Sequence, residues 1–318
     1  MAPRLVFVHG IGRPADPEIR LLAWTRALAE GAVAAGHSRF AQWLQAGPKD
    51  AVTLAYYGDL FARAGAQGAS VDAIGEPEME ILTRFLRELL EEQLADGPAD
   101  DVRDVMERAL LQLSPDGQSQ GLGEAIRHAV NAMTTVLSVR PLRKAGHWAS
   151  GTYLLGDLAQ VAAYLGRGEG VAGPPALDVR IRARISEALG DGPAVVAAHS
   201  LGSVAAFEAL HRHAADIPLF TTLGSPIAMR SVVWSRLDPQ PPRTPEQVGR
   251  WLNFWDRDDV IVARPRLERD IKPNAAGVLP ASSRVDSDGM WTHSAVKYLR
   301  QPAVAGPIAE TAEMIGLL

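Results

Sequence analysis

Short apolar runs alternate with longer helical patterns along most of this 318-residue chain. Five of these runs are predicted strands: Leu5–Val8, Val52–Tyr57, Ala194–Ala198, Leu219–Leu223 and Trp251–Trp255. Strands separated by helical segments are typical of a parallel sheet that helices cover on both faces. The third run is apolar throughout, which indicates burial on both of its faces. We therefore expect an α/β fold with a doubly wound, mostly parallel sheet.

The interval between the second and third predicted strands is unusually long. A crossover between parallel strands needs only about a dozen residues, so the sheet does not require most of it. Apolar residues at helical spacing mark three stretches within it, namely Ile81–Leu90, Leu122–Leu137 and Leu154–Leu165. We predict that residues 61–170 form a helical cap, inserted into a core made of residues 1–60 and 171–318.

Charge and composition limit the partners and the location of the protein. A net charge of −5 argues against nucleic acid or an anionic membrane as the main partner, because both recruit Lys and Arg. The acidic residues in the first half of the cap, among them Glu88, Glu91 and Glu92, are expected to form a solvated face. No apolar run reaches the ~20 residues of a membrane span, and the first run is too short for a signal peptide. We expect a soluble, cytoplasmic protein with no integral membrane segment, and the sequence does not indicate its oligomeric state.

Neither a metal nor a nucleotide cofactor is expected. The absence of cysteine excludes thiolate ligands and disulfides. His211 and His213 stand two residues apart on a predicted helix, where their side chains point in different directions. Residues 168–173 match the spacing of a dinucleotide-binding loop, but that motif needs a strand before it and a helix after it. Here a helical pattern precedes the match and two prolines follow it.

The third predicted strand leads directly into a turn centred on Ser200, and a helical pattern follows. A serine between a strand and a helix is typical of a nucleophile elbow, which holds the hydroxyl above the carboxyl ends of the strands. Such a tight turn needs small residues two positions before and after the serine, and Ala198 and Gly202 stand there. His199 and Leu201 flank the serine directly. Because a serine in this place could also be a simple helix N-cap, the interpretation depends on the partner residues.

The order of residues along the chain selects the general base. Hydrolases with a nucleophile elbow place an acid after the serine and a histidine after the acid. Three histidines follow Ser200, namely His211, His213 and His293. The first two lie on the helix that directly follows the elbow, with no strand end carrying an acid before them. We therefore predict that His293 takes the proton of Ser200 during attack on an acyl carbonyl.

Three carboxylates compete for the role of the acid, which orients the histidine. Asp256, Asp258 and Asp259 all follow the fifth predicted strand. We favour Asp259, because the apolar residues Val260 and Ile261 come next and suit a carboxylate held in the interior against the imidazole. Asp256 is the second candidate and Asp258 the third.

Backbone N–H groups must stabilise the oxyanion of the tetrahedral intermediate. The N–H of Leu201, directly after the nucleophile, is one predicted donor. The other is expected from the loop after the first strand, where Gly10 and Gly12 allow the backbone to turn toward the acyl oxygen, and we assign it to the N–H of Ile11. His9 is expected to orient this loop and to take no part in proton transfer.

Several of these segments resemble a known family. His9-Gly10-Ile11-Gly12 and the segment from Ala198 to Gly202 resemble the α/β-hydrolase lipases and esterases. The segment from Thr222 to Pro226, and the spacing of Asp256 and Asp259 after a Trp-Asn-Phe strand, are similar to the branch that contains class 3 lipases and GPI inositol-deacylase-like proteins.

The resemblance implies an α/β-hydrolase fold that lacks the strands preceding the His-Gly strand in the relatives, and it places Asp259 where the family has its acid. Val260 stands where the family usually has proline, and Ala198 where it usually has glycine. The resemblance covers roughly residues 4–60 and 175–300, and leaves the cap unassigned.

The expected function is that of a serine hydrolase that cleaves carboxylic esters through an acyl-enzyme intermediate. A small-molecule or lipid-like acyl substrate is the expected partner, because the cap is large enough to build an apolar pocket. A peptidase, thioesterase or amidase with the same three residues is an alternative. A degenerate hydrolase that serves as a binding module is another, since a fold does not imply a function.

Overall fold

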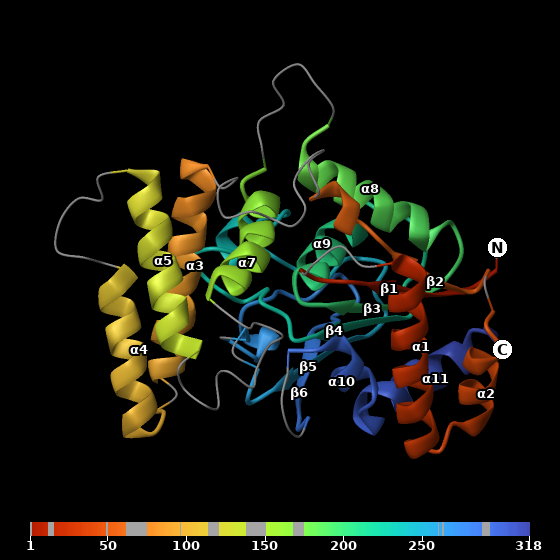
Figure 1. The fold of residues 1–318 in the computed structure, drawn as a ribbon. Helices are drawn as coiled ribbons and strands as arrows, with labels where there is room; N and C mark the ends of the chain where they lie inside the picture. The colour runs from red at the N-terminus through yellow and green to blue at the C-terminus, as the bar shows by residue number, and fades with distance from the viewer. Residues whose placement is uncertain are drawn as a thin grey trace.

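A computed structural model describes most of the chain (Figure 1). The residues that it does not describe are 1, 12–15, 49, 62–74, 96, 114–120, 138–150, 168–174, 260, 263 and 288–292, and the side chains of residues 151–156. Residues 168–173, whose spacing matches a dinucleotide-binding loop, therefore lie outside the described residues.

The described strands form one six-stranded sheet. They are β1 (Arg4–Val8), β2 (Val52–Ala55), β3 (Ala194–His199), β4 (Leu219–Leu223), β5 (Trp251–Asp256) and β6 (Pro280–Val285). Their order across the sheet is β2-β1-β3-β4-β5-β6, and every neighbouring pair is parallel. The predicted α/β class with a parallel sheet is confirmed.

Helices cover both faces of the sheet (Figure 1). On one face lie α1 (Pro17–Ala34), α2 (Ser38–Gln45), α10 (Ala295–Leu299) and α11 (Pro302–Met314), and on the other α8 (Leu177–Leu189) and α9 (Leu201–Leu210). Alternate residues of a strand point to opposite faces, so Leu5 and Phe7 pack with the first set while Val6 and Val8 pack with the second. Burial on both sides explains why β1 and β3 are nearly continuous apolar runs.

The chain order reverses in the middle of the sheet. From β1 the chain adds β2 on one side and then returns to add β3 on the other. In open parallel sheets the carboxyl ends of the strands at such a switch point border the crevice in which ligands bind. The loops that follow β1 and β3 are therefore the first place to look for a site.

The sixth strand is an addition to the sequence prediction. β6 pairs with β5 at the edge of the sheet, and its first and last residues, Pro280 and Val285, are its buried ones. An edge strand needs no continuous apolar run, and proline is tolerated at the start of such a strand. The segment Ala281–Arg284 is polar enough to look like a loop in the sequence.

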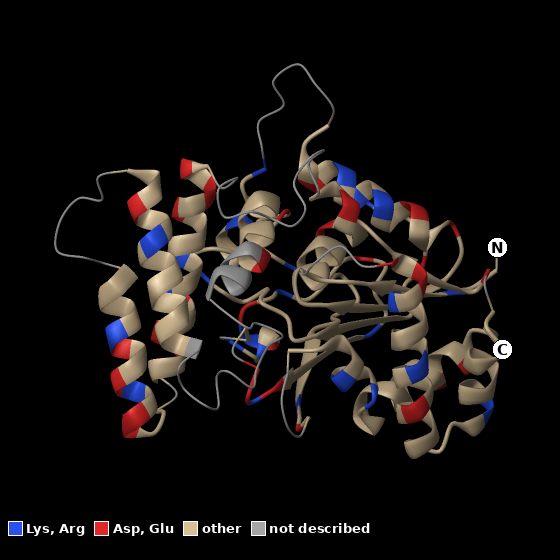
Figure 2. Ribbon diagram, viewed as in Figure 1, with Lys and Arg blue, Asp and Glu red and all other residues tan. Residues whose placement is uncertain are grey.

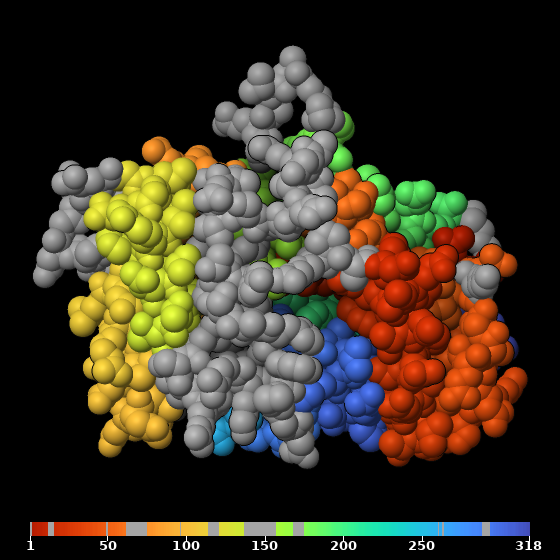
Figure 3. Space-filling model, viewed as in Figure 1, coloured from red at the N-terminus to blue at the C-terminus, as the bar shows by residue number. Residues whose placement is uncertain are grey.

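The predicted cap segment contains four described helices, which we term the helical block. They are α3 (Glu76–Ala95), α4 (Asp100–Leu113), α5 (Leu122–Leu137) and α7 (Gly151–Leu165). Its helices α3, α4 and α5 lie at one end of the molecule, with α1 and α2 at the other, and α7 lies between α3 and α9 (Figures 1 and 3). Its buried side chains, such as Phe85 and Met133, belong to the same apolar cluster as Val6 and Phe207. The block thus extends the core on the α9 side of the sheet, and its division from the core at residues 61 and 170 stays a prediction.

The described loops also contain short 3-10 helices, namely η1 (Gly58–Leu60), η3 (Trp234–Arg236) and η4 (Leu267–Arg269). α1 begins at Pro17, and the Asp16 carboxylate before it accepts the N–H groups of Glu18 and Ile19 at 2.8 and 3.3 Å. Acidic and basic residues alternate over the outer helices (Figure 2). None of the described helices has the length and hydropathy that a bilayer span requires.

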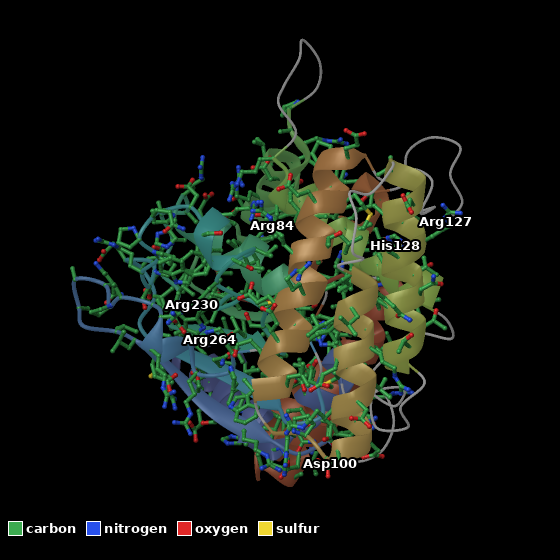
Figure 4. The ribbon with its side chains drawn as sticks, turned by 90° about the vertical axis from the view of Figure 1, so that its left-hand side faces the viewer. Arg84, Asp100, Arg127, His128, Arg230 and Arg264 are labelled. Carbon is green, nitrogen blue, oxygen red and sulfur yellow. The ribbon has the colours of Figure 1, made fainter. Side chains whose placement is uncertain are left out.

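The prediction that the acidic residues of the cap form a solvated face is wrong for Glu88. Glu88 on α3 is only 8% exposed, and its carboxylate accepts hydrogen bonds from the backbone N–H of Arg230, from the N–H of Ser231 at 2.9 Å and from the Ser231 hydroxyl. One turn later, Glu92 pairs with Arg264 at 2.8 Å. Arg230 and Arg264 lie on the core side of α3 in Figure 4. These carboxylates therefore attach the helical block to the loops that follow β4 and β5.

Glu88→Gln should lower the free energy of unfolding by about 2–3 kcal/mol, because the amide offers one acceptor oxygen to three donors and turns its own N–H₂ group toward one of them. Urea unfolding followed by circular dichroism measures this loss. The matched control is Glu91→Gln on the same helix, where the side chain is exposed and the change should be small. Equal losses for the two variants would show that Glu88 does not fasten the block.

Candidate active site

Ser200 occupies the one-residue turn between β3 and α9. Its φ of 54° and ψ of −131° lie in a region that residues other than glycine rarely adopt. Two backbone hydrogen bonds hold this conformation: the Ser200 N–H donates to Leu223 O at 3.0 Å, and Ser200 O accepts from the Ser203 N–H at 2.9 Å. At position 202 a Cβ would collide with the carbonyl oxygens of His9 and Val8, so glycine is needed there for α9 to start against the end of β1.

The structure brings Ser200, His293 and Asp259 together. His293 Nε2 lies 2.8 Å from Ser200 Oγ, and His293 Nδ1 lies 2.8 Å from each carboxylate oxygen of Asp259. Ser200 and Asp259 are each 1% exposed and His293 is 6% exposed. An ionised carboxylate only accepts hydrogen bonds, so the Asp259 contact places a proton on Nδ1. In the neutral ring this leaves Nε2 free to accept the proton of the Ser200 hydroxyl.

The three candidate acids lie in different environments. Asp259 faces the imidazole, and its Oδ1 also accepts the N–H of Ile261 at 3.1 Å. Asp256 instead accepts the N–H of Asp258 at 2.8 Å through Oδ1, and both the N–H and the hydroxyl of Ser287 through Oδ2. It thereby ties the turn after β5 to the segment after β6. Asp258 is exposed, and Val260 lies outside the described residues.

Gly224, at the end of β4, passes directly against the acid and the histidine. Its φ is +56°, and a Cβ at this position would lie 2.7 Å from Asp259 Oδ2 and 3.3 Å from His293 Nδ1. The next residue, Ser225, accepts a hydrogen bond from the Ser203 hydroxyl of α9 at 2.7 Å. In the sequence, this segment stands out only for its resemblance to the lipase branch. A glycine directly after a buried strand is the signal that could have placed it in the site.

The loop after β1 lies against Ser200. A Cβ on Gly10 would be 2.5 Å from Ser200 Cβ and 3.2 Å from Ser200 Oγ. Leu201 is the first residue of α9, where N–H groups have no acceptor within the helix and lie at the positive end of its dipole. Ile11 is partly buried and packs on the cluster that includes the helical block, while Gly12 lies outside the described residues. The roles of Ile11 and Leu201 as oxyanion donors stay predictions.

His9 connects this loop to the end of β2. Its Nε2 accepts the N–H of Tyr57 at 3.0 Å, its Nδ1–H donates to Gly10 O at 2.7 Å, and its ring stacks on that of Tyr57 with 4.1 Å between centroids. Burial, together with the nearby charge of Arg20, lowers the pKa of His9 to about 3, although the Gly10 hydrogen bond opposes this change. The ring is therefore neutral at ordinary pH. These contacts suit the orienting role predicted for His9.

His199 packs directly beside the candidate base. Its ring centroid lies 4.6 Å from that of His293, and Trp24 of α1 meets it edge-on at 6.2 Å. His199 is 7% exposed. The ring of His199 thus contacts both His293 and Trp24 of α1.

The interpretation of the site rests on this geometry. No protein-family model, curated protein or solved structure matches the chain. Within the described part of the chain, no group of three or more His, Asp or Glu side chains is placed to hold a metal ion. Chemically, the arrangement offers a hydroxyl, an imidazole and a carboxylate in series, in a buried setting where their electrostatic interactions are stronger than in water.

His9 should make the fold sensitive to acid. Between its ordinary value of 6.5 and its folded value of about 3, the unfolded state binds more protons, so the free energy of unfolding falls as the pH drops through this window. His9→Gln keeps an acceptor for the Tyr57 N–H and does not titrate. We expect the variant to be less stable than the wild type at pH 7.5, and this difference in the free energy of unfolding to narrow by about 2 kcal/mol between pH 7.5 and 5.

Urea unfolding at several pH values measures this gap, and all other titrating groups cancel in the comparison. A gap that stays constant from pH 7.5 to 5 would contradict a buried, neutral His9.

Proposed function

We propose that this chain is a serine hydrolase of the α/β-hydrolase type that cleaves carboxylic esters with Ser200 as nucleophile, His293 as general base and Asp259 as orienting acid. One observation carries the proposal: His293 Nε2 lies 2.8 Å from Ser200 Oγ while its Nδ1 lies 2.8 Å from both oxygens of Asp259. Ser200 and His293 are 93 residues apart in the chain. Sequence proximity therefore does not account for their contact, and this spacing of the three groups is the geometry that acyl transfer requires.

In the first half of the reaction, Ser200 Oγ attacks the ester carbonyl carbon and its proton passes to His293 Nε2. Asp259 stabilises the resulting imidazolium through the proton on Nδ1. The imidazolium then gives the Nε2 proton to the leaving alkoxide oxygen, the carbon–oxygen bond of the ester breaks, and the acyl group stays on Ser200.

In the second half, water takes the place of the alcohol. His293 Nε2 removes a proton from the water, the hydroxide oxygen attacks the acyl carbon, and the tetrahedral intermediate collapses. Ser200 leaves with the proton returned from His293, and the carboxylic acid is released.

The oxyanion of both intermediates needs donors near Ser200, and the first turn of α9 and the loop after β1 are the candidates. The Leu201 N–H belongs to a helix start, which favours a developing negative charge. The Gly10 backbone is close enough to Ser200 that a side chain there would collide with it. This closeness supports a donor from the Gly10–Ile11 segment.

An apolar acyl group is the substrate feature that the surroundings favour. Ile11, beside the nucleophile loop, packs on the apolar cluster that the helical block shares with the α9 face of the sheet. An acyl chain that extends from the site in this direction would contact the apolar side chains of this cluster. This supports ester substrates with an extended acyl chain, lipid-like ones included, over short polar ones.

Purified protein should hydrolyse p-nitrophenyl esters, and Ser200→Ala should lower kcat roughly 10⁴-fold or more, because the nucleophile is removed. The matched control is Ser235→Ala, which removes an exposed serine hydroxyl and should keep the wild-type rate. Equal hydrolysis by wild type and Ser200→Ala would contradict the proposal.

The same assay, run with acyl chains of increasing length and with the corresponding thioesters and anilides, identifies the substrate class. A rate that rises with acyl length supports an apolar acyl pocket, and a flat profile indicates an open site. Faster cleavage of the anilides or thioesters would replace the esterase with an amidase or thioesterase.

A further inference from the structure

We propose that Tyr298 is a positioning residue for the acid: its hydroxyl holds the Asp259 carboxylate and limits how strongly that carboxylate stabilises the protonated ring of His293. This inference rests on the proposed function, since it concerns the same acid and base. Neither the motifs nor the order of residues along the chain drew attention to Tyr298.

The Tyr298 hydroxyl lies against the turn that follows β5, which carries both Asp256 and Asp259. It donates to Asp259 Oδ2 at 2.7 Å and accepts the backbone N–H of Asp256 at 3.0 Å. The side chain is completely buried. It belongs to α10, which begins two residues after His293, so the short helix that follows the base returns a hydroxyl to the acid.

The direction of the two hydrogen bonds follows from their partners. The Asp256 N–H can only donate, so it uses a lone pair of the Tyr298 oxygen and leaves the O–H for Asp259. Burial raises the pKa of Tyr298 well above its ordinary value, and the charge of Asp259 raises it further. The phenol therefore keeps its proton at neutral pH and acts as a donor to Asp259.

The donors around Asp259 show what this hydroxyl contributes. Oδ1 accepts the Ile261 N–H at 3.1 Å, Oδ2 accepts the Tyr298 hydroxyl, and both oxygens face His293 Nδ1. Each donor draws part of the carboxylate charge toward itself. Without the hydroxyl, more of that charge faces the imidazole, so the protonated form of the ring is stabilised more strongly. A protonated ring cannot accept the proton of Ser200.

Other titratable groups near the base stay in place when the hydroxyl is removed. His199 packs on the ring of His293 from the end of β3. Asp256 and Asp258 lie in the turn after β5, and Lys297 lies on α10 itself. Because Tyr298→Phe alters none of these side chains, a change in the pH profile of this variant can be assigned to the hydroxyl.

The test measures kcat/KM against pH for the wild type and for Tyr298→Phe with the best ester substrate. We expect kcat/KM at neutral pH to fall about tenfold, mainly through kcat, because the carboxylate that orients the ring of His293 loses one of the two hydrogen bonds that hold it in place. We also expect the acid limb of the profile to move to higher pH. Tyr164→Phe is the matched control: its hydroxyl is equally buried and donates to the Glu208 carboxylate at 2.6 Å, away from the site. It should lower stability and leave the acid limb where the wild type has it.

A second variant tests the opposite direction. Incorporation of 3,5-difluorotyrosine at position 298 makes the hydroxyl a stronger donor and keeps the shape of the ring, so the acid limb should move to lower pH. This measurement also decides the matter if Tyr298→Phe does not fold.

The outcomes separate the two proposals. If the wild type shows no hydrolysis that depends on Ser200, the proposed function fails and the role of Tyr298 falls with it. If the wild type is active, an unmoved acid limb in Tyr298→Phe and in the fluorinated protein overturns the positioning role and leaves the hydrolase standing. A lower rate with an unmoved acid limb likewise overturns it, because that result indicates a structural contribution alone.

Discussion

Every strand of the sheet runs in the same direction, and the rest of the structure depends on this constraint. The carboxyl ends of parallel strands share one edge, so segments that are distant in the chain meet there. Ser200 follows β3, Gly224 follows β4, Asp259 follows β5 and His293 follows β6. The loop after β1 completes the arrangement with Gly10, at the point where the chain order reverses. If β3 or β5 ran in the opposite direction, Ser200 or Asp259 would lie at the other edge of the sheet, away from His293.

Buried carboxylates hold the helices around this edge. On α9, which begins directly after Ser200, Glu208 is completely buried and accepts the Tyr164 hydroxyl of α7 at 2.6 Å. It also pairs with Arg182 of α8 at 3.1 Å and accepts the backbone N–H of Asp238 at 3.0 Å. Glu88 on α3 likewise attaches the block to the core, because its carboxylate binds the backbone after β4. Removing one partner of such a group is costly because it leaves a buried charge uncompensated, so these links set the position of the helical block against the elbow helix.

The features that could be predicted from the sequence are those that follow from the order of residues along the chain and from the burial of apolar runs. The alternation of apolar runs predicted the parallel sheet, and the order of serine, acid and histidine selected Ser200 and His293, which the structure places in contact. Asp259 was favoured over Asp256 because apolar residues follow it, and this is the carboxylate that faces the ring. The catalytic roles of all three stay proposals.

What the sequence could not predict depends on contacts between distant segments. β6 is an edge strand whose polar middle resembles a loop, and Glu88 has the sequence context of a surface residue although it binds buried backbone. Tyr298 lies on a short helix with no motif around it, and only the fold brings its hydroxyl to Asp259. Side-chain partners of this kind are decided by packing, which a local pattern does not encode.

The most direct test of the account is covalent labelling. A fluorophosphonate should react with the wild-type protein by forming a bond between phosphorus and Ser200 Oγ with loss of fluoride, and mass spectrometry of the digested protein should locate one adduct, on the peptide that contains Ser200. His293→Ala should label at least a hundredfold more slowly, because the base that activates the hydroxyl is gone. An adduct on another residue, or equal labelling of the wild type and His293→Ala, would contradict the account.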